Sequence, residues 1–197
     1  MLKGLKKKGK FVLIAIASGI TLMSSGFAET MEEADLGEAK GIIKEFLSSL
    51  KAELQTALNE GGPVNAIRAC KEKEPVIAAD YSARTGWDVG RTSLGLRNPS
   101  TNAPDGWERQ VLLRFEERKA SGEDIKTMDF AEVTPVEGEN RFRYMQAIPT
   151  GGLCLTCHGA VLAPEVIRTL DETYPEDRAR GFSLGDIRGA FTLSKPL

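Results

Sequence analysis

Residues 137–148 (EGENRFRYMQAI) combine a turn with the start of a β-strand. The four residues 137–140 (EGEN) predict the turn, because glycine and asparagine are favoured where the chain reverses direction. After it, every second residue is mostly apolar, namely Phe142, Tyr144, Gln146 and Ile148. A period of two is typical of a half-buried strand, and another β segment is expected before the turn. The stretch therefore predicts a β-hairpin.

Helical patterns precede this hairpin. Residues 35–59 carry apolar side chains at three- and four-residue steps, which predicts a long amphipathic helix. Gly61-Gly62 should end this helix, and Pro63 should open a second one, interrupted at Pro75, that runs to about Arg84. A third helix is expected over residues 105–119, and its buried side should consist of Trp107, Val111, Leu112 and Phe115.

The remaining segments are shorter. Residues 86–104 are rich in glycine, proline and asparagine, which predicts turns around at most one short strand. A short helix should run from Pro164 to about Tyr174, and a last strand should lie around residues 189–193. Helices first and strands later favour an α+β fold. No repeat or linker divides the chain, so we expect a single domain.

The amino terminus has the pattern of a secretory signal peptide. The first ten residues contain five lysines and no acidic residue, and a mostly apolar run follows from Phe11 to Met23. Small residues, including Gly26 and Ala28, place the expected cleavage after Ala28. Residues 1–28 would then be the signal peptide and residues 29–197 the domain, in a periplasmic protein. If the segment stayed uncleaved, it would be the only contact with a membrane.

The charge of the exported part limits its partners. Five of the 26 Lys and Arg residues lie in the leader, so 21 basic residues face 28 acidic ones, a formal charge of −7. Such a surface repels nucleic acid and anionic lipid. We therefore expect no nucleic-acid partner.

Residues 154–158 (CLTCH) carry the chemistry. Cys154 and Cys157 are three residues apart, so both thiols can lie on one side of a helical turn. There they can add across the two vinyl groups of one haem, while the adjacent His158 ligates the iron. This is the attachment signal of haem c, and the export signal strengthens it. We predict one covalently attached haem c.

Three other interpretations fit less well. A thioredoxin-like pair would follow a strand and open a helix, whereas Pro149 and Gly151-Gly152 precede Cys154. A disulfide between cysteines three apart has awkward geometry. A zinc site could use Cys70 with the motif, but Cys157 and His158 are adjacent and cannot easily share one tetrahedron.

His158 is the only histidine in the chain, so one polypeptide cannot supply two histidine ligands to iron. The residues leave the distal position open, and the candidates are Cys70, Met31, Met128, Met145, a lysine, water or no ligand. Cys70 is the one cysteine that the motif does not use, and an unpaired thiol in an exported protein calls for an explanation. It falls three residues after Ile67 on the apolar face of the second helix, so we expect it to point inward. Without a second histidine, a peroxidase lacks its usual acid–base group, so we expect no enzyme activity.

Several segments resemble a family of single-haem, PAS-like c-type domains of unknown function. The matching segments cover about residues 35–195 and are 66–70 (AIRAC), 90–94 (GRTSL), 97–99 (RNP), Asn102, 104–108 (PDGWE), 154–158 (CLTCH) and 185–191 (GDIRGAF). Members of the family occur alone or as extracytoplasmic sensor modules of histidine kinases and chemoreceptors. The resemblance implies a PAS-like α+β fold with a long N-terminal helical segment. It also implies that His158 and Cys70 are the axial ligands.

Two functions follow from these expectations. The first is a redox or gas-ligand sensor module that takes a small gaseous ligand at iron and acts on a signalling protein. The second is a periplasmic electron-transfer cytochrome that serves a redox partner. No kinase or other output segment is recognised in the sequence. Arg91 and Arg97 could pair with the haem propionates or could stabilise turns, because a guanidinium group matches a carboxylate in either role.

Overall fold

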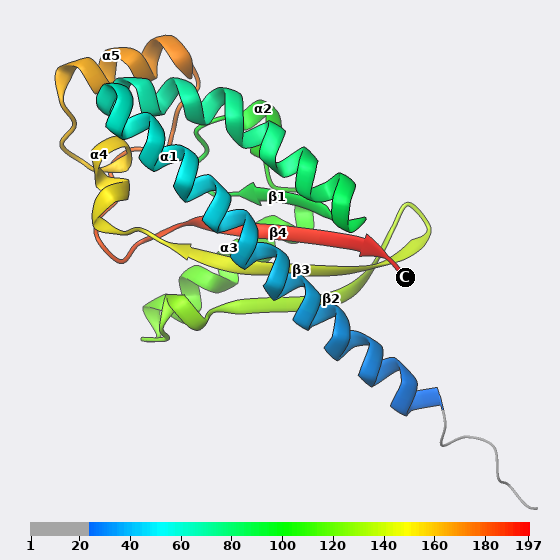
Figure 1. Cartoon of the computed structure of the whole chain (residues 1–197). Helices are drawn as coiled ribbons and strands as arrows, with labels where there is room; N and C mark the ends of the chain where they lie inside the picture. The colour runs from blue at the N-terminus through cyan, green and yellow to red at the C-terminus, as the bar shows by residue number, and fades with distance from the viewer. Residues whose placement is uncertain (1–23) are drawn as a thin grey trace, which may run out of the picture.

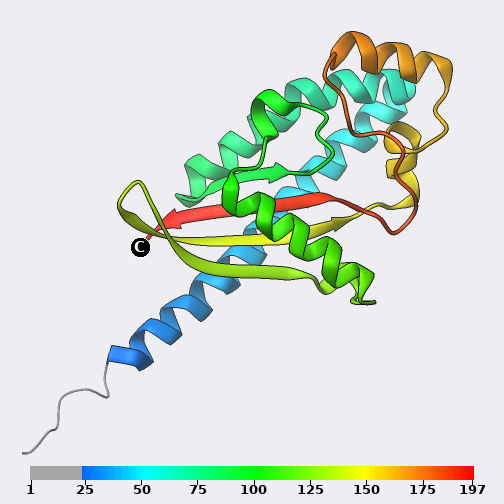
Figure 2. The ribbon, with the colours of Figure 1, turned by 180° about the vertical axis from the view of Figure 1, so that it is seen from behind.

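A four-stranded antiparallel sheet with helices on both faces forms the body of the molecule (Figures 1 and 2). The computed structural model describes residues 24–197, with side chains from Glu32 onward. The basic and apolar parts of the expected signal peptide lie outside these residues, and its cleavage stays a prediction. Within the described part, no helix is long and apolar enough to cross a membrane.

The strands are β1 (Asp88–Thr92), β2 (Asp129–Val136), β3 (Glu139–Pro149) and β4 (Ile187–Pro196). Their order in the sheet is β1-β4-β3-β2, so the C-terminal strand lies between β1 and β3. The predicted hairpin is β2–β3. Its loop is only Glu137 and Gly138, both with positive φ (53° and 90°), as in the tight turns that match the twist of antiparallel strands.

Helix α1 (Ser24–Thr85) is a helical hairpin rather than one rod. It reverses at Gly61-Gly62, where Gly62 has a φ of 66° that other residues rarely adopt. The two arms pack together through Phe46 and Tyr81, and the Ser49 and Tyr81 hydroxyl groups lie 3.0 Å apart. The break at the two glycines was predicted correctly.

Pro75 does not interrupt the second arm, contrary to the expectation from sequence. The helix continues through it to Thr85, and only Gly61 and Gly62 have non-helical dihedral angles. Proline removes one hydrogen bond and disfavours a helix interior. Here the arm packs through partly buried Ile77 and Ala78 and buried Tyr81 against the core, and this tertiary packing holds the helix across the proline.

The remaining helices are α2 (Pro99–Asn102), α3 (Gly106–Ala120), α4 (Leu155–His158) and α5 (Pro164–Thr173), with short 3-10 turns at η1 (Ile125–Thr127) and η2 (Gly152–Cys154). α3 and α5 lie close to the predicted ranges. α3 begins with a capping box, in which the Asp105 carboxylate accepts from the Glu108 N–H and the Glu108 carboxylate accepts from the Asp105 N–H.

Both faces of the sheet are covered, so β3 is not the half-buried strand that its alternation predicted. Phe142 and Tyr144 face α1, whereas Met145 and Ala147 face α3. Figures 1 and 2 show the two helices on opposite sides of the sheet. Even Arg143 is buried in the centre of the strand. The architecture is α+β with a long N-terminal helical segment, as predicted.

Candidate haem-attachment site

The CLTCH motif forms a compact helical turn at one end of the sheet, beside α5 and the bend of α1 (Figure 1). Residues 152–154 form η2 and residues 155–158 form α4. Cys154 and Cys157 are free and partly exposed. The Gly151 N–H donates to Cys154 Sγ at 3.4 Å. A helical turn carries both thiols, as the spacing predicted, and both remain accessible for reaction.

The ring of His158 is held in one orientation and one protonation state. Its Nδ1 lies 2.7 Å from the Ala179 carbonyl oxygen. Only a protonated nitrogen can donate to a carbonyl, so Nδ1 carries the hydrogen and Nε2 keeps its electron pair. Burial lowers the pKa of His158 to about 2, and the positive charges of Arg188 and Arg97 act in the same direction. A neutral imidazole with an unprotonated Nε2 is the form that binds metals.

Arg97 and Asp177 fix the loop that holds the histidine. Arg97 Nη2 donates to the carbonyl oxygens of Cys157 (2.6 Å) and Ala179 (3.0 Å), and Arg97 Nε lies 3.2 Å from Asp177 Oδ1. The Asp177 carboxylate is only 1% exposed. Of the two roles open for Arg97, this geometry supports stabilisation of the turn. Phe182 adds a backbone hydrogen bond to the His158 carbonyl oxygen at 2.9 Å.

Cys70 is exposed, which corrects the expectation that it points into the apolar interior. Ile67, three residues earlier on the same arm, packs inward with Val166, Leu170 and Tyr174. Nearby protein atoms displace enough water to raise the pKa of the Cys70 thiol, although Arg91 and Arg97 lower it, and solvent still reaches the residue. Cys70 is therefore not a small apolar side chain filling the core.

Cys70 and the motif lie within electrostatic reach of each other. Cys70 contributes to the raised pKa of Cys157, whose main cause is burial. Arg91 and Arg97 act on the pKa values of both Cys70 and His158. The next residue after Cys70 contacts α5, because Lys71 Nζ donates to the Thr173 carbonyl oxygen at 2.8 Å. The bend of α1 thus brings Cys70 to the end of the sheet that holds the motif.

The other distal candidates are less suitable. Met128 and Met145 are fully buried in the core between α3 and the sheet. The side chain of Met31 lies outside the described side chains. Among the described side chains of residues 32–197, no three His, Cys, Asp or Glu side chains are arranged to hold a metal ion.

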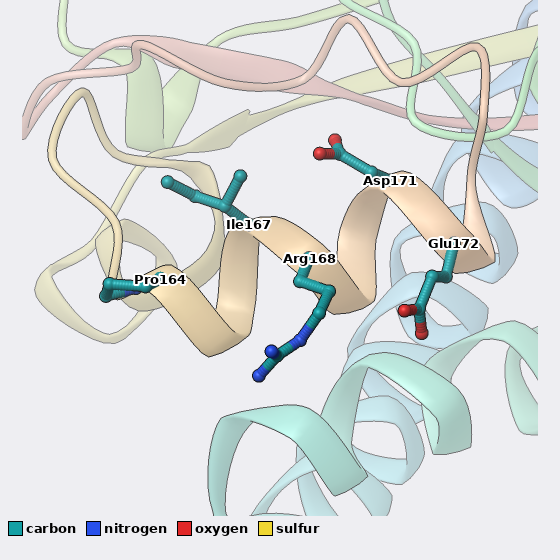
Figure 3. A pocket seen from close by; sticks show the side chains of 5 residues that line it. All are labelled: Pro164, Ile167, Arg168, Asp171 and Glu172. Carbon is teal, nitrogen blue, oxygen red and sulfur yellow. The ribbon is translucent and has the colours of Figure 1, made fainter.

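Two hollows elsewhere on the surface lack these groups. One of about 510 Å³ lies on α5, where Ile167 and Asp171 point to one side of the helix and Arg168 and Glu172 to the other, so the side chains do not converge (Figure 3). Another, of about 320 Å³, lies between α1 and β1 and includes the ion pair of Arg91 with Glu74. Neither is lined by a cysteine or histidine.

The site is thus a Cys-X-X-Cys-His turn at the end of an α+β domain, under a long helical hairpin. The family model described as Tll0287-like matches residues 28–196, and the chain belongs to this family. Among solved structures, the crystal structure of the cyanobacterial haem protein Tll0287 is similar, with 25% sequence identity and a TM-score of 0.62. The match covers 83% of this chain and 95% of that one. No curated protein matches the chain.

Sequence reasoning from the motif missed Asp177, Ala179 and Arg188. Arg188 Nε lies 3.2 Å from His158 Nδ1 and 3.4 Å from Nε2. Arg188 does lie in the GDIRGAF segment that carried the family resemblance, and this was the one available signal. Ala179 carried none because it acts through its backbone carbonyl, which has no residue-type signature. Asp177 carried none because its partner Arg97 lies 80 residues away in the sequence.

Proposed function

We propose that the protein is an exported, mono-haem c-type cytochrome with its haem attached to Cys154 and Cys157. The observation that carries this proposal is the CLTCH turn, with two free thiols and a neutral His158 whose Nε2 is unprotonated. Membership of the Tll0287-like family, and similarity to a haem protein of that name, support the same cofactor. His158 is the proximal ligand in this proposal, and the signal peptide directs the domain to the periplasm.

Cys70 is the distal ligand in the same proposal. Its exposure, and the arginines it shares with His158, support this role over packing in the core. Bound haem would supply a redox-active iron, and a small gas could bind it in place of Cys70. The residues of the chain provide the attachment, the ligand orientation through Ala179, and the surrounding positive charge.

We favour a sensor over an electron carrier because of where the two axial residues lie. Cys70 belongs to α1 and His158 to α4, so ligation by Cys70 would tie the long helical hairpin to the site. A PAS-like domain that changes shape when the link between Cys70 and the site forms or breaks could signal to a protein partner without catalysing a reaction. An electron carrier would instead keep both ligands in both redox states and exchange electrons with a redox partner.

The attachment is tested by the motif variants Cys154→Ser and Cys157→Ser. Each should retain at most one thioether, so the yield of haem-containing protein should fall. His158→Ala should alter the absorption spectrum because the proximal ligand is lost. The matched control is Cys70→Ala, which should keep both thioethers. Wild-type spectra in all three motif variants would overturn the assignment of the site.

The axial role of Cys70 is tested by absorption spectra and redox titration of wild type beside Cys70→Ala. A thiolate ligand favours ferric iron, so the wild-type midpoint potential should be low and the substitution should raise it. Carbon monoxide binding to the reduced wild-type protein would support the sensor, and its absence would favour the electron carrier. An unchanged ferric spectrum and potential in Cys70→Ala would show that Cys70 does not bind iron.

A further inference from the structure

An irregularity in the pairing of β3 with β4 places the side chain of Arg188 next to His158. In the β3–β4 ladder Ile148 pairs with Gly189, but Pro149 pairs with Ile187, so Arg188 has no partner and occupies a β-bulge. Bulges turn a side chain out of the regular alternation and often lie beside functional sites. Here the guanidinium Nε reaches the ring of His158, at 3.2 and 3.4 Å from its two nitrogens.

Contacts with Ser93, Gly95 and Phe182 hold Arg188 in place. Its Nη1 donates to Ser93 Oγ and to the Gly95 carbonyl oxygen, both at 3.1 Å, and its carbonyl oxygen accepts from Ser93 Oγ at 2.7 Å. The guanidinium carbon lies 5.3 Å from the centre of the Phe182 ring. Three side-chain contacts and one backbone hydrogen bond therefore fix the orientation of Arg188.

Arg188 forms no ion pair with a carboxylate of the described residues. Three arginines act on His158, and two of them have acidic partners: Arg91 pairs with Glu74, and Arg97 pairs with Asp177. No ion pair within residues 24–197 includes Arg188. A partly buried cation without a counter-ion is costly, so the completed site should contain an anion next to it.

The hydrogen bond from Arg188 Nε–H to His158 would be lost when His158 binds iron. Nδ1 of His158 already donates to Ala179, so only Nε2 can accept from Arg188. Nε2 is the nitrogen that the proposed iron ligation uses. Once it binds metal, the Nε–H of Arg188 needs another acceptor. The two propionate groups of haem are the carboxylates that arrive with the cofactor, and a guanidinium fork can bind one of them with paired hydrogen bonds.

We propose that Arg188 binds a haem propionate and so anchors the edge of the cofactor near His158. This inference rests on the proposed attachment of haem at the motif. Arg188, rather than the arginines already paired with Glu74 and Asp177, supplies the counter-charge. Its fixed positive charge also disfavours the more positive ferric state, so it raises the midpoint potential of the haem.

The test compares holoprotein of wild type, Arg188→Gln and Arg109→Gln by resonance Raman spectroscopy and redox titration. Arg109 is an exposed arginine on α3, across the sheet from α1, so its variant controls for the change in net charge. In Arg188→Gln the propionate bending band should shift and the midpoint potential should fall, while Arg109→Gln should match wild type. An unshifted band in Arg188→Gln would overturn the proposal, even if the potential changed.

A crystal structure of the wild-type holoprotein covers the case in which Arg188→Gln yields no haem-containing protein. The guanidinium group should lie within hydrogen-bond distance of a propionate oxygen, and a guanidinium that contacts only protein atoms would contradict the proposal. The two failures are distinguishable. Wild-type protein without covalent haem would end the proposed function, whereas haem-containing wild type with an unaltered Arg188→Gln band would end only this inference.

Discussion

The residues around the CLTCH turn are of two kinds, the motif residues themselves and the residues that hold the motif in position. The CLTCH motif stands out in the sequence because both cysteines and His158 lie within five consecutive residues. Asp177 and Arg188 are separated from their partners by 80 and 30 residues, and no local pattern records such contacts. The exposure of Cys70 was also unpredictable from its helical face, because it depends on how α1 bends toward α5.

The buried pair of Arg97 and Asp177 should be the most sensitive polar contact of the site. Asp177→Ala leaves Arg97 without its counter-ion, so the free energy of unfolding should fall by about 3 kcal/mol. Asp171 is a suitable control, because its pair with Arg180 leaves the carboxylate 61% exposed. Asp171→Ala should lose less than about 1 kcal/mol. Urea unfolding of the haem-containing proteins measures both, and equal small losses would refute the importance of the buried pair.

At the scale of elements, local signals were predicted well and long-range ones poorly. The glycine pair at 61–62, the range of α3 and the turn at 137–138 follow from residue types with strong local preferences. The continuity of α1 through Pro75 and the burial of both faces of β3 follow from packing between distant segments. The strand order β1-β4-β3-β2 has the same origin, since it joins residue 88 to residue 194.

There is no room for a side chain at Gly189 in β4. A Cβ atom there would lie 2.4 Å from the Thr92 carbonyl oxygen and 3.0 Å from Ser93 Cβ. Gly189→Ala should therefore push β4 away from the loop after β1 and destabilise the protein by about 1 to 3 kcal/mol. It should also displace the adjacent Arg188 and change the haem spectrum.

Gly41→Ala is the control, because nothing lies within 4 Å of a Cβ added there and the residue is in a helix. This change should raise the free energy of unfolding by up to about 1 kcal/mol. Urea unfolding again gives both values. A Gly189→Ala protein as stable as wild type would show that the loop after β1 yields without cost.

Over the whole molecule, acid should weaken the fold through carboxylates that join the sheet to α3. Around Asp105, burial alone would raise the pKa, but hydrogen bonds from Arg143 and from the backbone N–H groups of Glu108 and Trp107 outweigh it and lower the pKa below 3.8. A carboxylate with a lowered folded-state pKa stabilises the fold above the unfolded-state value. That contribution is lost as the pH falls through the folded-state value.

The urea midpoint of wild type should therefore decline as the pH is lowered from 5 toward 3. Asp105→Asn keeps an N-cap side chain but cannot titrate, so its midpoint should start lower and decline less over the same range. Parallel declines in the two proteins would contradict a role for Asp105 in this acid sensitivity. The measurement needs only the midpoints, which urea titrations at three or four pH values provide.

The proposed export and covalent attachment of one haem are tested most directly by the intact mass of the protein. When the chain is produced with haem-attachment machinery and recovered from the periplasm, mass spectrometry should find a polypeptide that begins at Glu29 and carries the mass of one haem. Peptide mapping should place that mass on the segment with Cys154 and Cys157. A periplasmic protein of unmodified polypeptide mass, made beside a control cytochrome that does acquire haem, would contradict the account.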